Sequence, residues 1–284
     1  MKVVDQDCIR SLSHSALWIS VFAVYISERH SIQQEPLYPH PSMHSFSNTP
    51  NLSPAEGVDA GGHDKDTVDT ILGNFQQACS RHRQGSPLLL VVTKFSLTLR
   101  LLRFIPYRYL YVSSGWMAQH QEVDVAAEHI AQRLELEPRR ARQNLLHAAQ
   151  LFRIIRSQQQ FDPYDSFTFL MAVLYIWNYD RFVVSTKTQD PFGADAENNI
   201  LRIDQNMNER LQEKWIAGMF ERPKKLHISG IGVLNGHDSM RRIFRESIRI
   251  LSHEKAWSSR ANAIKYALHQ ILLGGVPSFP AETE

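Results

Sequence analysis

The chain has 284 residues, of which 43% are hydrophobic and 21% charged, values that are ordinary for a globular protein with a sizeable core. Lys and Arg (31) barely outnumber Asp and Glu (29), so the net charge is only +2. A protein that binds nucleic acid by itself is usually far more basic, and the composition therefore argues against direct DNA contact by this chain.

The N-terminal part of the chain is expected to form a helix followed by a flexible linker. Residues 1–27 contain the apolar run Ala16 to Ile26, which suits a buried helix. Asp5 and Asp7 interrupt the basic leader of a signal peptide, and the run is shorter than the ~20 residues that span a bilayer. A membrane tether through this run is the alternative. Residues 28–65 are rich in proline and polar residues, which favours a flexible linker.

Residues 66–274 are expected to form one all-α domain, followed by a short tail over residues 275–284. Apolar residues recur at helical spacing over most of this range, and convincing strand patterns are absent. The sequence predicts helices over 66–80, 88–104, 119–136, 138–155, 167–177, 206–220, 239–251 and 256–273. Between them, residues 107–116 are predicted to be irregular and residues 183–203 to form a surface loop. The short apolar run 88–93 is also compatible with a strand.

The stretch from Pro138 to Trp177 is expected to form the centre of the core. Its first helix has one apolar face, made by Ala141, Leu145, Ala148, Phe152 and Ile155. Asp165 is predicted to cap the second helix, residues 167–177, which is apolar on nearly every side and too short to span a membrane. A helix of that kind belongs inside a protein core.

Two later helices are predicted from the spacing of their apolar residues. In the first, Met207, Leu211, Trp215 and Met219 recur every four residues. The second follows a cap at Asp238 and has a buried face made by Met240, Ile243, Phe244, Ile248 and Leu251. The same helix carries Arg241, Arg242, Arg245 and Arg249. We interpret these arginines as a solvated face paired with Glu246 and Glu254, because the chain has no broader basic excess.

No pattern in the chain predicts catalysis, a cofactor or a metal site. His147 has no evident partner in the sequence, and we expect it to be hydrogen-bonded to a neighbouring element rather than to act as a base. Asp162 and Asp165 have the spacing of a turn and a cap. Cys79 and His82 form half of a zinc-ligand pattern, but no second ligand pair follows. We therefore predict that the protein is not an enzyme and assign no site residues.

Short segments between residues 75 and 272 share their order and spacing with a known family. These segments are 104–106 (FIP), 114–116 (SGW), 139–142 (RRAR), 147–156 (HAAQLFRIIR), 163–164 (PY), 174–177 (LYIW), 215–218 (WIAG), 230–232 (GIG), 239–251, and Trp257 with 259–260. They resemble the regulatory region of fungal-specific transcription factors that carry two-Cys/two-His zinc fingers. The resemblance implies an all-α regulatory domain in the nucleus that acts on transcription through other transcription regulators, with no membrane association.

In that family the zinc fingers bind DNA. No finger pattern occurs in the 284 residues, so the resemblance assigns zinc ligands to no position of this chain. DNA would then be reached only through a missing finger region or through a partner. A fragment of a longer factor, an incorrect gene model and a finger-less relative are all open interpretations. The alternative function is a small-molecule sensor, whose effector would bind among Trp116, Phe152, Tyr175 and Trp177.

Overall fold

The computed structural model describes residues 87–116, 118–184, 200–205, 207–220, 225–234, 237–255 and 258–273, together with Gly73. The expected N-terminal helix, the linker, the helix over 66–80 and the C-terminal tail lie outside the described residues. The chain divides into two compact units, Met1–Ser96 and Leu97–Glu284. The domain boundaries proposed from the sequence stay predictions, and the architecture below is that of the second unit.

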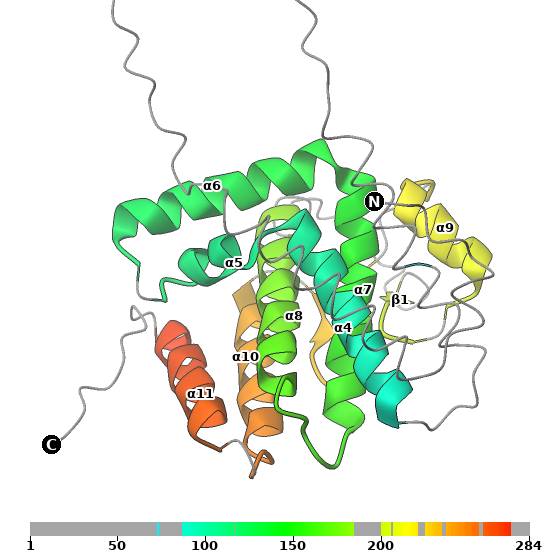
Figure 1. Cartoon of the computed structure of the whole chain (residues 1–284). Helices are drawn as coiled ribbons and strands as arrows, with labels where there is room; N and C mark the ends of the chain where they lie inside the picture. Colours follow the sequence, from blue (N-terminus) through cyan, green and yellow to red (C-terminus); the bar gives the residue numbers. More distant parts are fainter. Residues whose placement is uncertain are drawn as a thin grey trace, which may run out of the picture. The chain divides into compact units, whose positions relative to one another are not determined.

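The described residues are mainly helical, which confirms the predicted all-α class (Figure 1). The α-helices are α4 (Pro87–Phe104), α5 (Tyr107–Ser113), α6 (His120–Leu136), α7 (Pro138–Ser157), α8 (Asp165–Tyr179), α9 (Glu209–Ala217), α10 (His237–Leu251) and α11 (Ser258–Leu272). A short π-helix, η1 (Asp180–Val184), continues α8. The strand alternative for residues 88–93 is wrong, because this run lies in α4.

Helix α8 is the centre of the core, as the sequence predicts. It packs against α5, α7, α10 and α11, and Figure 1 shows it between α7 and α10. Every residue from Thr168 to Tyr179 is buried, so all sides of this helix are covered by neighbouring elements. The predicted face of α7 is also buried, and Phe152 of that face stacks on Phe169 of α8 with ring centroids 5.3 Å apart.

The junction of α6 and α7 is held by charged side chains around an aromatic ring. Glu137 pairs with Arg133 at 3.0 Å and with Arg140 at 2.9 Å. Both arginines place their guanidinium carbon 5.7 Å from the centroid of the buried Phe104 ring. Pro138 begins α7 directly after Glu137, where its missing N–H leaves no helical hydrogen bond unmade. These contacts fix the direction in which α7 leaves the junction.

The prediction of an irregular segment over residues 107–116 is wrong, because Tyr107–Ser113 form α5. Pro106, with φ −54° and ψ 141°, precedes the helix as its N-cap. Leu110 is fully buried, and Tyr107 and Tyr111, one helical turn apart, pack edge to face at 6.1 Å. Aromatic side chains thus provide much of the apolar contact of α5. The helix is too short for aliphatic residues to recur at helical spacing, so the pattern did not predict it.

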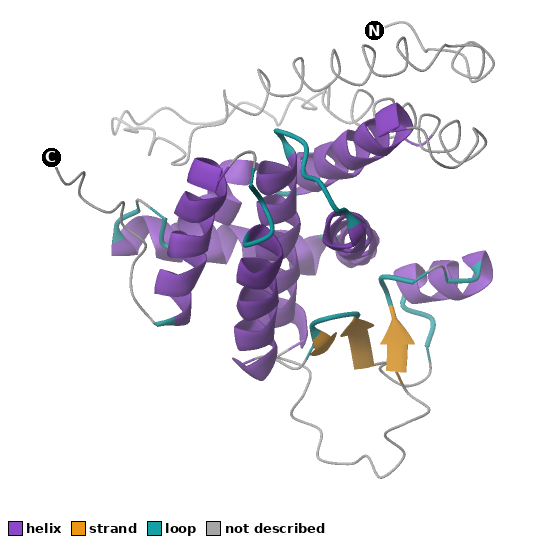
Figure 2. Cartoon of the chain, turned by 90° about the horizontal axis from the view of Figure 1, so that it is seen from below, coloured by secondary structure: helices purple, strands orange, loops and turns teal. Residues whose placement is uncertain are grey.

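A small three-stranded sheet is the second departure from the predictions. It contains β1 (Ile200–Arg202), β2 (Lys225–Ile228) and β3 (Gly232–Val233), in the order β1-β2-β3. Strand β1 pairs parallel with β2, and β2 pairs antiparallel with β3. Figure 2 shows the sheet in orange to one side of the helices. The loop predicted for 183–203 is therefore wrong at both described ends, since η1 ends at Val184 and β1 begins at Ile200.

Helix α9 is shorter than predicted. Asn208 caps the helix by accepting a hydrogen bond from the backbone N–H of Arg210, and Gly218 ends it in the left-handed conformation. Of the residues spaced by four, Trp215 is buried, whereas Leu211 is 38% and Met219 72% exposed. The spacing thus predicted the helix, which meets the core through Trp215.

Two predicted caps also differ from the structure. Tyr164 is the N-cap of α8, and the carboxylate of Asp165 accepts a hydrogen bond from the backbone N–H of Asp162 in the preceding turn. Asp238 lies in the first turn of α10, which begins at His237, rather than before it. Both carboxylates lie at a helix N-terminus, where the helix dipole favours negative charge. Of the predicted α10 face, Ile243, Phe244 and Leu251 are buried and Ile248 is half-buried.

We predict that Leu174→Ala in α8 lowers the free energy of unfolding by about 2–5 kcal/mol, because it opens a cavity around a side chain that is 1% exposed. The matched control is Leu136→Ala at the end of α6, where the side chain is 68% exposed and the loss is expected to stay within about 0.5 kcal/mol. Urea unfolding of the three proteins measures both values. Equal losses for the two variants would contradict the placement of α8 in the core.

Candidate functional site

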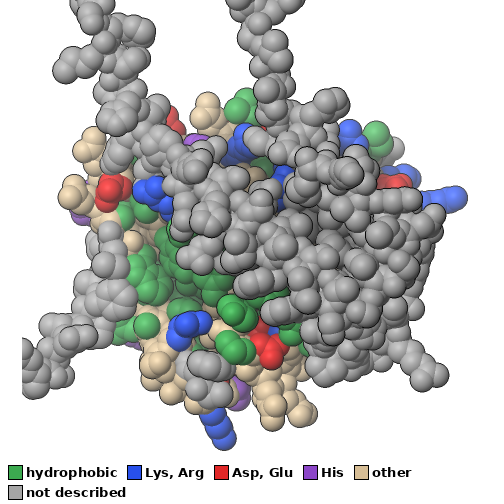
Figure 3. Space-filling view, in the orientation of Figure 1, with side chains coloured by type: hydrophobic (Ala, Val, Ile, Leu, Met, Phe, Trp, Pro, Cys, Tyr) green, Lys and Arg blue, Asp and Glu red, His purple; other side chains and the backbone are tan. Residues whose placement is uncertain are grey.

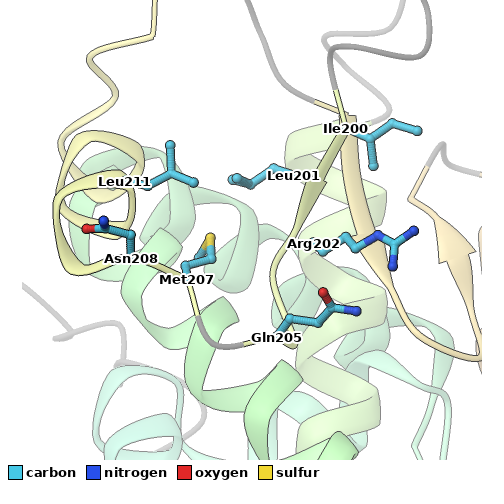
Figure 4. Close-up of a pocket in the computed structure, with 7 residues that line it drawn as sticks. All are labelled: Ile200, Leu201, Arg202, Gln205, Met207, Asn208 and Leu211. Carbon is cyan, nitrogen blue, oxygen red and sulfur yellow. The ribbon is translucent and has the colours of Figure 1, made fainter.

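A groove lies along strand β1 and the beginning of α9, and we call it the β1–α9 groove. Its volume is about 450 Å³. It is lined by Ile200, Leu201, Arg202, Gln205, Met207, Asn208 and Leu211. Figure 4 shows Leu201 pointing from β1 toward Leu211 of α9, while Arg202 points to the opposite side of the strand. The side chains alternate as the pleat of a strand requires, so one side of the groove is apolar and the other carries Arg202 next to Ile200.

Buried polar contacts hold the groove in place. The backbone N–H of Ile203 donates to the carbonyl of His227, which continues the pairing of β1 with β2. Asp204 follows directly and is 3% exposed, and its Oδ2 accepts a hydrogen bond of 3.0 Å from the backbone N–H of Ser229. Asn208 then starts α9. The turn between β1 and α9 is thereby fixed to β2 rather than left free.

The groove carries a positive charge and exposed apolar surface. Arg202 is exposed and has no hydrogen-bond or ionic partner within the described ranges, and none of the lining residues is acidic. Ile200 and Leu211 are 41% and 38% exposed, which is high for large apolar side chains. Chemically, such a surface can accept a ligand that presents apolar groups on one side and an anion on the other.

Arginines from two core helices attach the sheet and α9 to the helical core. Arg142 of α7 donates from Nε to the carbonyl of Ile216, near the end of α9, at 2.8 Å. Arg242 of α10 donates to the carbonyl of Ile231, directly before β3, at 2.8 Å and to that of Val233, in β3, at 2.5 Å. Arg242 therefore does not belong to the solvated face that the sequence predicts for the α10 arginines.

An ion-pair network between α7 and α10 supports the turn between β2 and β3. Glu246 pairs with Arg249 at 2.7 Å, as predicted, and also with Arg156 of α7 at 3.0 Å. The hydrogen bond from Arg249 lowers the pKa of Glu246 most, although partial burial opposes the shift. Gly230 lies against this network with φ +89°, and a Cβ there would lie 2.8 Å from Arg156 Cζ and Glu246 Oε1.

His147 takes the structural role that the sequence predicts. It is 8% exposed, and Nη1 of Arg100 donates to its Nε2 at 3.3 Å. Burial, followed by the positive charge of Arg100, lowers the pKa of His147 to about 3. A neutral imidazole whose lone pair accepts a hydrogen bond from arginine is not available as a general base.

A second group of buried polar residues lies at the end of α8. The Ser239 hydroxyl donates to Oδ2 of Asp180, and both residues are at most 1% exposed. Asn178 donates to the carbonyl of Leu174 at 2.8 Å and to the Ser113 hydroxyl at 3.3 Å. These bonds connect α8 and η1 to α10 and α5, and they satisfy polar groups that would otherwise be costly to bury.

The four aromatic residues proposed for an effector pocket each pack against a different neighbour. Phe152 stacks on Phe169, Tyr175 packs on Phe104 and Trp177 packs on Phe244, with ring centroids 5.3, 6.3 and 5.5 Å apart. Trp116 packs edge to face on Tyr111 at 5.7 Å. None of the four lines the β1–α9 groove. The groove could not be predicted from the sequence, because the alternation of apolar and polar residues is too short in strands of three and four residues.

Two further observations hold for the described ranges alone. Within them, no three His, Cys, Asp or Glu residues come together in a way that could hold a metal ion. No helix in those ranges combines the length and the apolar character needed to cross a membrane. The apolar run 16–26 lies outside them.

Comparison with known proteins gives one significant similarity. A protein described as a transcription factor from Gibberella fujikuroi is 26% identical to this chain over 160 residues. The matched region covers 55% of this chain and 20% of the relative, so the chain spans about a fifth of the length of that protein. No family model matches the chain, and no solved structure matches it. The chain is thus similar, at a distance, to a fungal transcription factor.

We predict that Gly230→Ala destabilises the protein more than Gly232→Ala does. Both glycines have φ near +90°, so each substitution should cost about 1–3 kcal/mol of backbone strain. Only at Gly230 does the new Cβ meet the Arg156–Glu246 pair, because the nearest atom at Gly232 is Arg242 Nε at 3.7 Å. Urea unfolding measures both losses. In a protein that already carries Arg156→Ala, Gly230→Ala should cost less than it does in the unsubstituted protein. Equal losses at the two glycines would contradict the close contact of the turn with this pair.

Proposed function

We propose that this chain is the regulatory part of a fungal transcription factor of the two-Cys/two-His zinc-finger class. It acts in the nucleus through contacts with other transcription regulators. The similarity to the Gibberella fujikuroi transcription factor is the observation that carries this proposal. DNA contact and zinc belong, in this proposal, to a finger region or a partner rather than to the residues of this chain.

The distribution of charge supports protein contacts over direct DNA contact. The face in Figure 3 shows basic and acidic side chains interspersed around hydrophobic ones, with no continuous basic stripe among the side chains that it colours. On α10, Arg242 and Arg249 are already engaged with protein groups. Arg241 and Arg245 are left as exposed cations on that helix. A specific DNA-binding surface needs several such groups along one face.

The roles of the buried polar residues agree with a protein that is not an enzyme. His147 is held neutral by burial and by Arg100, and Asp180 accepts a hydrogen bond from Ser239 inside the core. A catalytic site would need a nucleophile or base that can reach a substrate in a concave surface. The small-molecule sensor stays an alternative prediction, but the packing of its four aromatic residues in separate pairs does not favour it.

The proposal predicts that the chain changes transcription when it is brought to a promoter. The chain would be fused to an unrelated DNA-binding domain, and a reporter would be compared with that domain alone at equal abundance. Activation or repression by the fusion is the expected result, and Leu136→Ala, an exposed substitution, should behave as the unsubstituted fusion does. A reporter level equal to that of the DNA-binding domain alone would contradict the proposal.

A further inference from the structure

We propose that the β1–α9 groove binds an extended peptide in which acidic and apolar residues alternate. This inference deepens the proposed function, because it rests on a role in protein contacts and names the chemistry of the partner. The partner segment would add a strand to the edge of the small sheet, and its alternate side chains would contact the two sides of β1. Three features of the described residues carry the inference.

The first feature is the free edge of β1. The order of the sheet places β1 at one end, and within the part of the chain that the structure describes it pairs only with β2. The backbone N–H of Ile203 points to β2, where it donates to the His227 carbonyl. Because backbone groups alternate along a strand, those of Arg202 point to the other side, away from β2. An extended peptide can meet them there.

The second feature is the difference between the two sides of β1. Leu201 points toward Leu211 and Met207 on one side, and Arg202 extends on the other side, which it shares with the exposed Ile200 (Figure 4). A peptide that pairs with the edge of a strand also directs successive side chains to opposite sides. Its apolar residues would therefore contact the leucine side while the residues between them contact the arginine side.

The third feature is the charge. Arg202 is exposed and has no ionic partner among the described residues, and no acidic residue lines the groove. A carboxylate at alternate positions of the peptide would form an ion pair with Arg202, and a basic residue there would be repelled. Segments in which acidic and hydrophobic residues alternate are typical of disordered activation regions of transcription regulators. The chemistry of the groove and the proposed function thus point to the same partner class.

The test is fluorescence anisotropy with the full chain and a fluorescein-labelled synthetic peptide, Leu-Asp-Leu-Asp-Leu-Asp-Leu. Saturable binding that weakens with added salt is the expected result. The same peptide with lysine in place of aspartate should not bind. Failure of the aspartate peptide to bind, or equal binding of the lysine peptide, would overturn the proposal. The reporter assay above does not depend on this peptide, so the two proposals can fail separately.

Two pairs of variants locate the binding at the groove. Arg202→Gln should weaken binding about three- to fivefold, as expected for one exposed ion pair. The control Arg241→Gln on α10 removes another exposed cation that has no ionic partner among the described residues, and it should have no effect. Ile200→Pro removes an outward backbone N–H at the first residue of the strand, where proline is tolerated. It should weaken binding more than Ile200→Ala, which removes only the side chain. Binding that is unchanged in both Arg202→Gln and Ile200→Pro would overturn the assignment to this groove.

A second copy of the chain is the competing occupant of the edge. Analytical ultracentrifugation of the protein alone distinguishes the two cases, because β1 edges paired between copies would make the chain dimeric. A monomer, with peptide bound at one site per chain, is the expected result. A dimer that Ile200→Pro converts to a monomer would show that the edge is already occupied and would overturn the proposal.

Discussion

The packing of α8 on α7 is the constraint on which the rest of the structure depends. Helix α8 has apolar side chains on nearly all sides, so it is stable only when other elements surround it. The hydroxyl of Tyr175 in α8 donates to the carbonyl of Ala141 in α7 at 2.9 Å. This bond and the stacking of Phe152 on Phe169 fix the register between the two helices. Helices α5, α10 and α11 then cover the other sides of α8.

The groove is connected to this core both by buried apolar side chains of its sheet, such as Leu201, Leu226 and Ile228, and by arginines. Arg142, Arg156 and Arg242 extend from α7 and α10 to the end of α9 and to the turn beside β3. Hydrogen bonds of this kind depend on direction, so they add a defined orientation to the apolar packing of the sheet. The region proposed to meet a partner thus lies on short elements carried by a stable helical core, which is common for binding surfaces.

The sequence predicted the parts of this fold that depend on local periodicity. Apolar residues recur at helical spacing from Ala141 to Ile155, and α7 has the predicted start and buried face. Helix α5 was missed because rings such as Tyr107 and Tyr111 replace aliphatic contacts, and the sheet was missed because its pairing joins residues far apart in the chain. The groove depends on that pairing and could not be predicted locally. The structural role of His147 was predicted, but its partner Arg100 lies 47 positions away.

Amide hydrogen exchange of the full chain is the measurement that tests the central place of α8 most directly. The account predicts that the amides of Phe169 to Trp177 exchange only when the whole unit unfolds, because every residue between them is buried. The amides of Ile200 to Arg202, at the edge of the small sheet, should exchange through smaller local openings and therefore faster. Exchange in α8 as fast as in β1 would contradict this expectation, because α8 could not then be the stable centre of the core on which the other helices pack.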